Sequence, residues 1–153
     1  MFLPSDYRDH FRKLLLQTLR HYSRKYSRSG EYRINCNFYQ VVEYMLDNQK
    51  TSIIDLGCGM GHCLEMCRRL GMKVKGIELD QALIDAGYDF VKYGDLRRLE
   101  KSELIGFDVI YSYGPFMNDE MNSRFIQGLL SIKAPNQVIL HYGKSDKNFN
   151  LYE

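Results

Sequence analysis

The stretch 53–61 constrains this chain most. It reads Ile-Ile-Asp-Leu-Gly-Cys-Gly-Met-Gly, an apolar run with one acid that leads into glycines at three alternate positions. Alternate glycines directly after a strand let the backbone turn sharply and let a ligand approach bare main chain. Residues 62–70 are expected to form a helix, whose first free N–H groups would point at the same place. A strand, a bare loop and a helix N-terminus together predict a cradle for a nucleotide-like ligand.

The glycine spacing narrows the kind of nucleotide. A dinucleotide fingerprint needs Gly-x-Gly-x-x-Gly, but His62 stands where its third glycine would fall. A phosphate-binding Walker loop ends in Gly-Lys-Ser/Thr, a tripeptide that does not occur in this chain. A dinucleotide-dependent dehydrogenase therefore stays only as a remote alternative.

Strands and helices are expected to alternate after residue 37. Alternation of this kind predicts an α/β fold with a mainly parallel sheet and helices on both faces. Right-handed crossovers then give a doubly wound sheet in the order 3-2-1-4-5. The expected strands are 52–56, 73–78, 89–93, 107–112 and 137–142, and the expected helices are 37–48, 61–70, 81–86, 99–104 and 119–132.

Five segments in this order resemble the motifs of the class I S-adenosylmethionine-dependent methyltransferases. The segments are 55–61, 74–80, 93–96, 107–112 and 132–140, and the resemblance extends over roughly residues 37–142. It implies a Rossmann-like fold that binds S-adenosylmethionine and releases S-adenosylhomocysteine after transferring a methyl group. The family usually adds a sixth strand and an antiparallel seventh, for which residues 143–153 are too few. The sheet edge is thus expected to be bare, covered by the N-terminal helix, or paired with a second copy in a homodimer.

The resemblance also implies which residues contact the cofactor. The glycines would pass beneath its amino-acid end, Asp55 would organise the loop, and Glu78 would accept hydrogen bonds from the ribose hydroxyls. The adenine would lie against Leu79 and be read by Asp95. Structural alternatives remain: Asp55 satisfied by loop N–H groups, Glu78 as a solvated acid, and Asp95 as part of a Gly-Asp turn. The full predicted set is Asp55, Gly57, Cys58, Gly59, Gly61, Glu78, Leu79, Asp95, Leu96, Tyr111 and Ser112.

The methyl acceptor is not identified by any motif. Family members that methylate bases or glutamine carry Asn/Asp-Pro-Pro-Tyr after the fourth strand, whereas residues 113–116 here read Tyr-Gly-Pro-Phe. Tyr111, Tyr113 and His141 are the candidate catalytic residues, each with a purely structural role as the alternative. The acceptor thus stays open among small molecules, proteins and RNA. A module that binds S-adenosylmethionine without transferring methyl groups, or a regulatory subunit, is the second hypothesis.

The length of 153 residues predicts a single domain, with a basic helix over 1–30 packed on a Rossmann-like domain over 31–153. Residues 1–33 hold eight Lys/Arg against three Asp/Glu, a net charge of +5, which leaves −3 for the rest of the chain. Such a segment can contact nucleic acid. We favour the simpler interpretation, because its aromatic residues recur at helical spacing on one apolar stripe. The stripe consists of Phe11, Leu15, Leu19, Tyr22 and Tyr26.

Composition predicts a cytoplasmic protein that does not associate with a membrane. No apolar run reaches the roughly 20 residues of a membrane span, and no leader-like stretch opens the chain. The four cysteines do not form the paired sets typical of zinc sites, so we expect reduced thiols and no bound metal.

Overall fold

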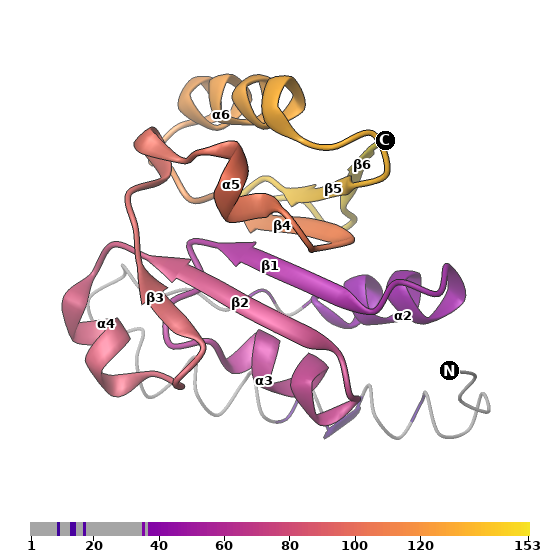
Figure 1. Ribbon diagram of the computed structural model, residues 1–153. Helices are drawn as coiled ribbons and strands as arrows, with labels where there is room; N and C mark the ends of the chain where they lie inside the picture. The colour runs from indigo at the N-terminus through magenta and orange to yellow at the C-terminus, as the bar shows by residue number, and fades with distance from the viewer. Residues whose placement is uncertain (1–8, 10–12, 15–16, 18–34, 36) are drawn as a thin grey trace. The chain divides into compact units, whose positions relative to one another are not determined.

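The computed structural model describes residues 9, 13–14, 17, 35 and 37–153 (Figure 1). The chain falls into two compact units, residues 1–50 and 51–153, and each is described here by itself. Nearly all of the predicted N-terminal helix, its apolar stripe and its boundary at residue 30 lie outside the described residues. These expectations, and the packing of that helix on the core, stay predictions.

In the first unit, the helix expected over 37–48 is present as α2 (Tyr39–Asp47). Its buried side chains recur at three- and four-residue steps, as expected of a helix with one apolar face. They are Val41, Val42, Met45 and Leu46.

The second unit contains a six-stranded sheet in the order β3-β2-β1-β4-β5-β6. Its first five strands are parallel and confirm the predicted order. The strands β1, β4 and β5 carry long apolar runs because both faces of a parallel sheet are covered. The bounds are β1 (Ser52–Leu56), β2 (Lys73–Glu78), β3 (Val91–Tyr93), β4 (Val109–Tyr113) and β5 (Val138–Tyr142).

The sequence led us to expect that the sheet ends at β5, but the structure has one more strand. A sixth strand, β6 (Asn150–Tyr152), pairs antiparallel with β5. The loop before it closes through the N–H of Gly143, which donates to a carboxylate oxygen of Asp146 at 2.8 Å. Tyr152 packs against the hydrophobic core. A three-residue strand has too little periodicity to be predicted from sequence. The edge of β5 is therefore paired within the chain. A homodimer formed through the edge of the sheet stays a prediction.

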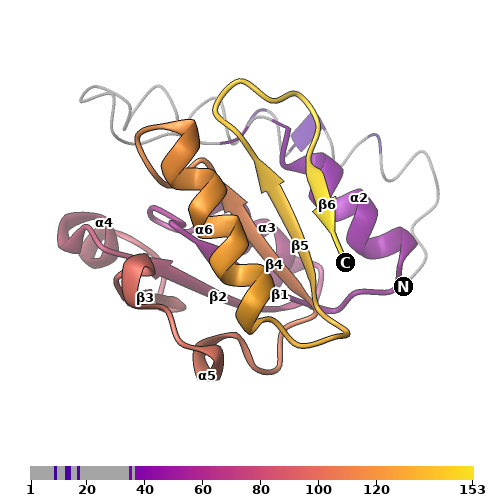
Figure 2. The same ribbon diagram turned by 90° about the horizontal axis from the view of Figure 1, so that it is seen from above.

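Helices cover both faces of this sheet, as predicted (Figures 1 and 2). The two helices α3 (His62–Arg69) and α4 (Gln81–Ala86) lie on one face. The other face carries α5 (Lys101–Leu104) and α6 (Asp119–Ile132). This division follows from right-handed crossovers, because the chain moves from β1 outward to β3 and then returns past β1 to β4.

The main hydrophobic core lies between the sheet and the α5–α6 layer. Alternate residues of the strands face it, and the helices contribute the opposite wall. Its buried members are Ile54, Leu56, Ile77, Leu104, Phe107, Ile110, Ile126, Leu129 and Ile139. Burial of these side chains fixes the register of β1, β2, β4 and β5, and with it the positions of the residues that follow each strand.

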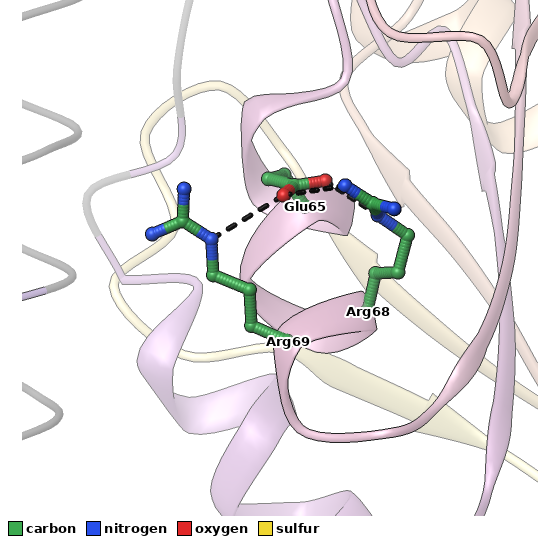
Figure 3. A network of polar contacts seen from close by, with 3 residues as sticks. All are labelled: Glu65, Arg68 and Arg69. Atoms are coloured by element: carbon green, nitrogen blue, oxygen red, sulfur yellow. Dashed lines mark hydrogen bonds and ion pairs between the residues drawn. The ribbon is translucent and has the colours of Figure 1, made fainter.

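A polar network fixes the last turns of α3 (Figure 3). The buried Glu65 carboxylate accepts two hydrogen bonds from the Arg68 guanidinium, at 2.7 and 2.8 Å, and one from Arg69 at 3.3 Å. The bond from Arg68, more than any other cause, lowers the pKa of Glu65. The Arg68 guanidinium carbon also lies 5.9 Å from the centre of the Phe90 ring, just before β3. An arginine of the last turn thereby attaches the helix to the loop that precedes β3.

Candidate functional site

The glycine loop turns from β1 into α3 with left-handed backbone angles. The φ angles are +86° at Gly57, +61° at Gly59 and +92° at Gly61, which precedes the first turn of α3. The N–H groups of Gly57 and Cys58 both donate to the carbonyl of Ile77, at 2.8 and 3.1 Å. The loop is thus attached to the end of β2 where it leaves β1.

A side chain would have no space at Gly61 and would be tight at Gly57. A Cβ on Gly61 would lie 2.7 Å from Phe90 Cε1 and 2.8 Å from a methyl of Val91, and one on Gly57 would lie 3.2 Å from Pro115 Cβ. The loop therefore passes closely between the residues around β3 and the segment after β4.

The side chain of Cys58 packs on β2 at a position that only glycine fits. A Cβ on Gly76 would overlap Cys58 Sγ. Burial is the main reason that the pKa of Cys58 is raised, so the thiol stays protonated. The buried side chain of Cys58 thus anchors the loop on β2, while the backbone of Cys58 forms part of the turn.

Glu78 holds the loop at its centre, a role that the sequence did not predict. One oxygen of its carboxylate accepts the N–H of Gly59 at 2.8 Å, and the other accepts those of Leu79 and Asp80 at 2.8 and 3.0 Å. A carboxylate offers about four acceptor positions, so three bonds leave capacity for a ligand hydroxyl. The same side chain can therefore organise the cradle and bind within it.

Asp55 is buried on β1, with only 5% of its surface exposed, beside Gly76 of β2 and Tyr111 of β4. Burial, and next the negative charge of Glu78, raise its pKa well above the usual value. The loop N–H groups expected to satisfy it donate instead to Ile77 and Glu78. Within the described residues, Asp55 is thus a buried acid close to a second acid with no cation beside it.

The residues that follow β2 and β3 lie at the same edge of the sheet as the glycine loop. Leu79 is half-exposed, and Asp80 caps α4 by accepting the N–H of Ala82 at 2.9 Å. Asp95 accepts the N–H of Arg97 at 3.0 Å and pairs with its guanidinium at 2.8 Å. These bonds lower the pKa of Asp95 to about 2. Asp95 therefore already has a charged partner, consistent with the turn interpretation.

Leu96 lies close to the glycine loop. Its Cδ1 would be 3.9 Å from a Cβ on Gly57, on which Pro115 also packs. Leu96 and Pro115 thus flank the beginning of the loop with apolar surface.

The candidate tyrosines form an aromatic cluster. Tyr111 is 2% exposed, and its ring meets that of Tyr142 edge to face at 6.3 Å between centres. Tyr113, at the end of β4, meets the same ring at 6.4 Å and is half-buried. The packing alternative describes Tyr111 well, whereas Tyr113 keeps part of its surface exposed at the edge where β4 ends.

Ser112 and His141 lie on the opposite face of the sheet from Asp55 and Tyr111, because neighbouring side chains of a strand alternate. The Ser112 hydroxyl and His141 Nδ1 are 2.6 Å apart, and both residues are buried. Burial lowers the pKa of His141. The structure thus divides the predicted site residues between two faces instead of gathering them in one group.

Neither a metal-binding cluster nor a membrane-spanning helix is found over the part of the chain that the structure describes. There, no three His, Cys, Asp or Glu side chains are grouped as a metal site would require. Among the same residues, no helix has the length and apolar character needed to cross a membrane.

Comparison with known proteins gave matches to solved structures alone. Scans with protein-family models and against curated proteins found no match. The S-adenosylhomocysteine-bound methyltransferase PaMTH1 of Podospora anserina superimposes with a TM-score of 0.61 at 16% identity, over 92% of this chain and 72% of that one. The plantazolicin methyltransferase BpumL, also with S-adenosylhomocysteine, gives 0.56 at 18% identity.

An RNA methyltransferase of Salinibacter ruber with S-adenosylhomocysteine gives a TM-score of 0.51 at 22% identity, over 66% of this chain and 72% of that one. The match to BpumL covers 90% of this chain but only 61% of the other protein. This chain is therefore shorter than the enzyme it matches, and identities this low establish the fold alone. In its described part, the chain has the fold of the class I S-adenosylmethionine-dependent methyltransferases.

Proposed function

We propose that this protein binds S-adenosylmethionine in the cradle after β1 and transfers its methyl group to an acceptor. The observation that carries the proposal is the glycine loop tied by Glu78 to the end of β2. It lies at the carboxyl ends of β1 and β2, next to β4, where the strand order reverses. Open α/β sheets bind their ligands at such a point.

The charges of the cradle support a cationic ligand. Asp55 is buried next to Glu78, and their mutual repulsion together with burial disfavours the charged carboxylate. A ligand with an ammonium group and a sulfonium would offset this repulsion and favour the ionised form of both carboxyl groups. The loop leaves β1 at Gly57, which is exposed, so a ligand there meets main chain instead of a side chain.

The chain's own residues then have separable tasks. Asp55 would hold the ammonium end, Glu78 would use its remaining acceptor capacity for ribose hydroxyls, and Leu79 and Leu96 would contact the adenine. The bound cofactor supplies a methyl group on a positively charged sulfur, which is already a good leaving group. The protein therefore needs to orient the acceptor in line and exclude water.

Binding and turnover test the proposal in two steps. Calorimetric titrations with S-adenosylmethionine and with S-adenosylhomocysteine are expected to give saturable binding at one site, and NAD is expected to give none. Transfer of labelled methyl groups from S-adenosylmethionine to small-molecule, protein and RNA fractions then tests catalysis. If neither S-adenosylmethionine nor S-adenosylhomocysteine binds, the proposal is refuted.

A cofactor-binding module without transferase activity is the second candidate. It is favoured by the separation of the candidate catalytic residues, because His141 lies on the opposite face of the sheet from Tyr111. This candidate predicts binding of both cofactor forms but no labelled product in any acceptor fraction.

A further inference from the structure

A polar cavity lies on the α5–α6 face of the sheet, apart from the proposed cofactor site. Its volume is about 280 Å³, near the lower limit of small-molecule pockets. It is lined by the first turns of α6, which lies over this face in Figure 2, by the end of β5 and by the loop from β5 to β6. Asp55 points to the opposite face, because it alternates with Ile54 and Leu56 of the hydrophobic core. A molecule in this cavity is therefore separate from one bound at the glycine loop.

The strand register directs polar side chains into the cavity. His141 of β5 stands opposite Ser112 of β4 and Asn150 of β6. His141 and Asn150 each lie two positions from a residue that packs in the core, Ile139 and Tyr152 respectively, so their side chains share that face. Both line the cavity, which is thus built from one continuous part of the sheet and the helix above it.

His141 offers one ring nitrogen for a ligand. The residue is only 6% exposed, and its Nδ1 is 2.6 Å from the Ser112 hydroxyl. Within the described part of the chain, no hydrogen bond to Nε2 is found, although Asn122 and Asn150 in the same wall are well bonded. Burial lowers the pKa of His141, so the ring is neutral at neutral pH. Because the Ser112 hydroxyl can turn to donate or to accept, Nε2 can do either toward a ligand.

The charges around the cavity favour a cation. Asp119 and Asp146 contribute two carboxylates, and Lys144 contributes one ammonium. That ammonium donates to the carbonyl of Met117 at 3.0 Å. One oxygen of the Asp146 carboxylate is used in the turn before β6, and the described residues donate no hydrogen bond to the other. The lining therefore has one net negative charge and carboxylate oxygens available to a ligand ammonium.

One segment, residues 114–118, separates the cavity from the glycine loop and contacts both. On the loop side, Pro115 packs on Gly57. On the cavity side, Asn122 accepts the N–H of Phe116 at 3.0 Å and donates to its carbonyl at 3.2 Å. A ligand in the cavity would keep water from these bonds and so strengthen them. Its binding would thus stabilise the segment against which the glycine loop packs.

We propose that this cavity is an effector site. It binds a small molecule with an ammonium group for the two carboxylates and a hydroxyl for His141 Nε2, and its occupant raises the affinity of the glycine loop for S-adenosylmethionine. No methyl transfer takes place in it, because residues 114–118 stand between the two sites. Binding in the cavity goes beyond the proposed function, whereas the effect on cofactor affinity rests on it. Such coupling is reciprocal, so the cofactor tightens binding of the effector by the same factor.

Three four-carbon compounds with one hydroxyl in common test the charge preference of the site. They are 4-aminobutan-1-ol, butane-1,4-diol and 4-hydroxybutanoate, whose second group is cationic, neutral or anionic. Each is titrated into the full chain and followed by NMR at the imidazole signals of His141. We expect saturable shifts there, with 4-aminobutan-1-ol bound at least about fivefold more tightly than 4-hydroxybutanoate.

Calorimetry measures the coupling between the two sites. The affinity for S-adenosylhomocysteine is determined with and without saturating 4-aminobutan-1-ol, and 4-hydroxybutanoate at the same concentration serves as the control for general solvent effects. We expect the amino alcohol to raise that affinity about fivefold, at the lower end of typical coupling, and 4-hydroxybutanoate to leave it unchanged. Saturating S-adenosylhomocysteine should raise the affinity for the amino alcohol by the same factor.

Asp119→Asn and Glu120→Gln form a matched pair of variants. Each removes one negative charge from the first turn of α6, but only Asp119 lines the cavity, and Glu120 pairs with Arg124 instead. Both residues are exposed, so folding of both variants is secure. Asp119→Asn is expected to weaken binding of 4-aminobutan-1-ol about threefold, and Glu120→Gln to leave it unchanged.

The site is overturned if none of the three compounds shifts the His141 signals, if 4-hydroxybutanoate binds there most tightly, or if the two variants weaken binding equally. The effector role is overturned if the amino alcohol binds but leaves the affinity for S-adenosylhomocysteine unchanged or lowers it. Failure to bind S-adenosylhomocysteine under any condition would instead refute the proposed function, and the His141 shifts would still decide the site.

Discussion

Replacing Glu78 with glutamine should weaken the attachment of the glycine loop, and the hydrogen bonds of Glu78 define the expected loss of stability. The carboxylate accepts one N–H on one oxygen, from Gly59, and two on the other, from Leu79 and Asp80. Glutamine has one accepting oxygen, and its best orientation keeps the two bonds at Leu79 and Asp80. It then turns an NH₂ group toward the N–H of Gly59. Loss of one bond to a charged group costs about 1.5–3 kcal/mol.

This loss should appear both in stability and in binding. We expect Glu78→Gln to lower the free energy of unfolding in urea by about 1.5–3 kcal/mol. Where the same bond is needed to order the cradle, a cost of this size corresponds to a roughly ten- to hundredfold lower affinity for S-adenosylhomocysteine. Faster hydrogen exchange at the Gly59 amide would place the change in the loop.

Glu103→Gln is the matched control. Glu103 accepts the N–H of Glu100 at 2.8 Å in the capping box of α5, outside the glycine loop. Glutamine also serves at this position of a capping box and keeps an accepting oxygen, so this variant should change stability by no more than about 0.5 kcal/mol, with unchanged affinity for S-adenosylhomocysteine. If Glu78→Gln bound that ligand as tightly as Glu103→Gln, the tethering role of Glu78 would be wrong.

Three further variants test other contacts of the structure. Gly61→Ala should lose about 2–5 kcal/mol of unfolding free energy, because the left-handed φ costs about 1–2 kcal/mol and the overpacking against Phe90 about 1–3 kcal/mol. Gly128→Ala should instead gain about 1 kcal/mol, because Gly128 lies in the interior of α6 and a Cβ there meets no atom within 4 Å. Urea unfolding of both variants measures these two changes, and a Gly61→Ala variant as stable as the original would contradict the first. Asp55→Asn should be more stable than the original, by a margin that grows from the ordinary aspartate pKa up to the raised pKa of Asp55 and is constant above it, because between the two only the unfolded chain is ionised. Its affinity for S-adenosylmethionine should fall, and an equal melting temperature at all pH values would contradict this. Glu65→Gln should be less stable than the original at neutral pH. The difference should vanish as pH falls through the lowered pKa of Glu65, because the original then loses its ion pairs with the arginines. Melting curves from pH 7 to pH 2 measure this difference.

The strand order could be predicted from sequence because several independent patterns agreed. Apolar runs such as 53–54 and 138–140 marked buried strands, and the alternation with helices left one topology. The strand ends then placed the glycine loop, Glu78 and Asp95 at one edge of the sheet. These are consequences of connectivity, which a linear pattern carries well.

Side-chain partners could not be predicted in the same way. The sequence assigned the loop-organising role to Asp55, but the loop N–H groups bond to Ile77 and Glu78. It also grouped His141 with the tyrosines, although the alternation of strand side chains places His141 on the other face. Tyr111 stands opposite Leu140 and His141 opposite Ser112, a pairing register that neither strand's sequence encodes by itself. The bond partners of Glu78 depend on loop geometry that no spacing encodes.

Short elements set the other limit. The strand β6 has three residues and its place depends on the turn closed by Asp146, which becomes visible only once β5 is fixed. The cavity beside it depends on this turn and on α6 together. Features that arise from two distant segments in contact therefore escape prediction from linear patterns.

Contact between an adenosyl sulfonium and the main chain at 57–61, held by Glu78, is the claim on which the proposed function depends. Chemical-shift mapping of backbone amides during titration with S-adenosylmethionine tests it most directly. We predict the largest changes at residues 55–61 and 78–80, with smaller ones at 95–96. Saturable shifts confined to another part of the chain, or none at all, would contradict it.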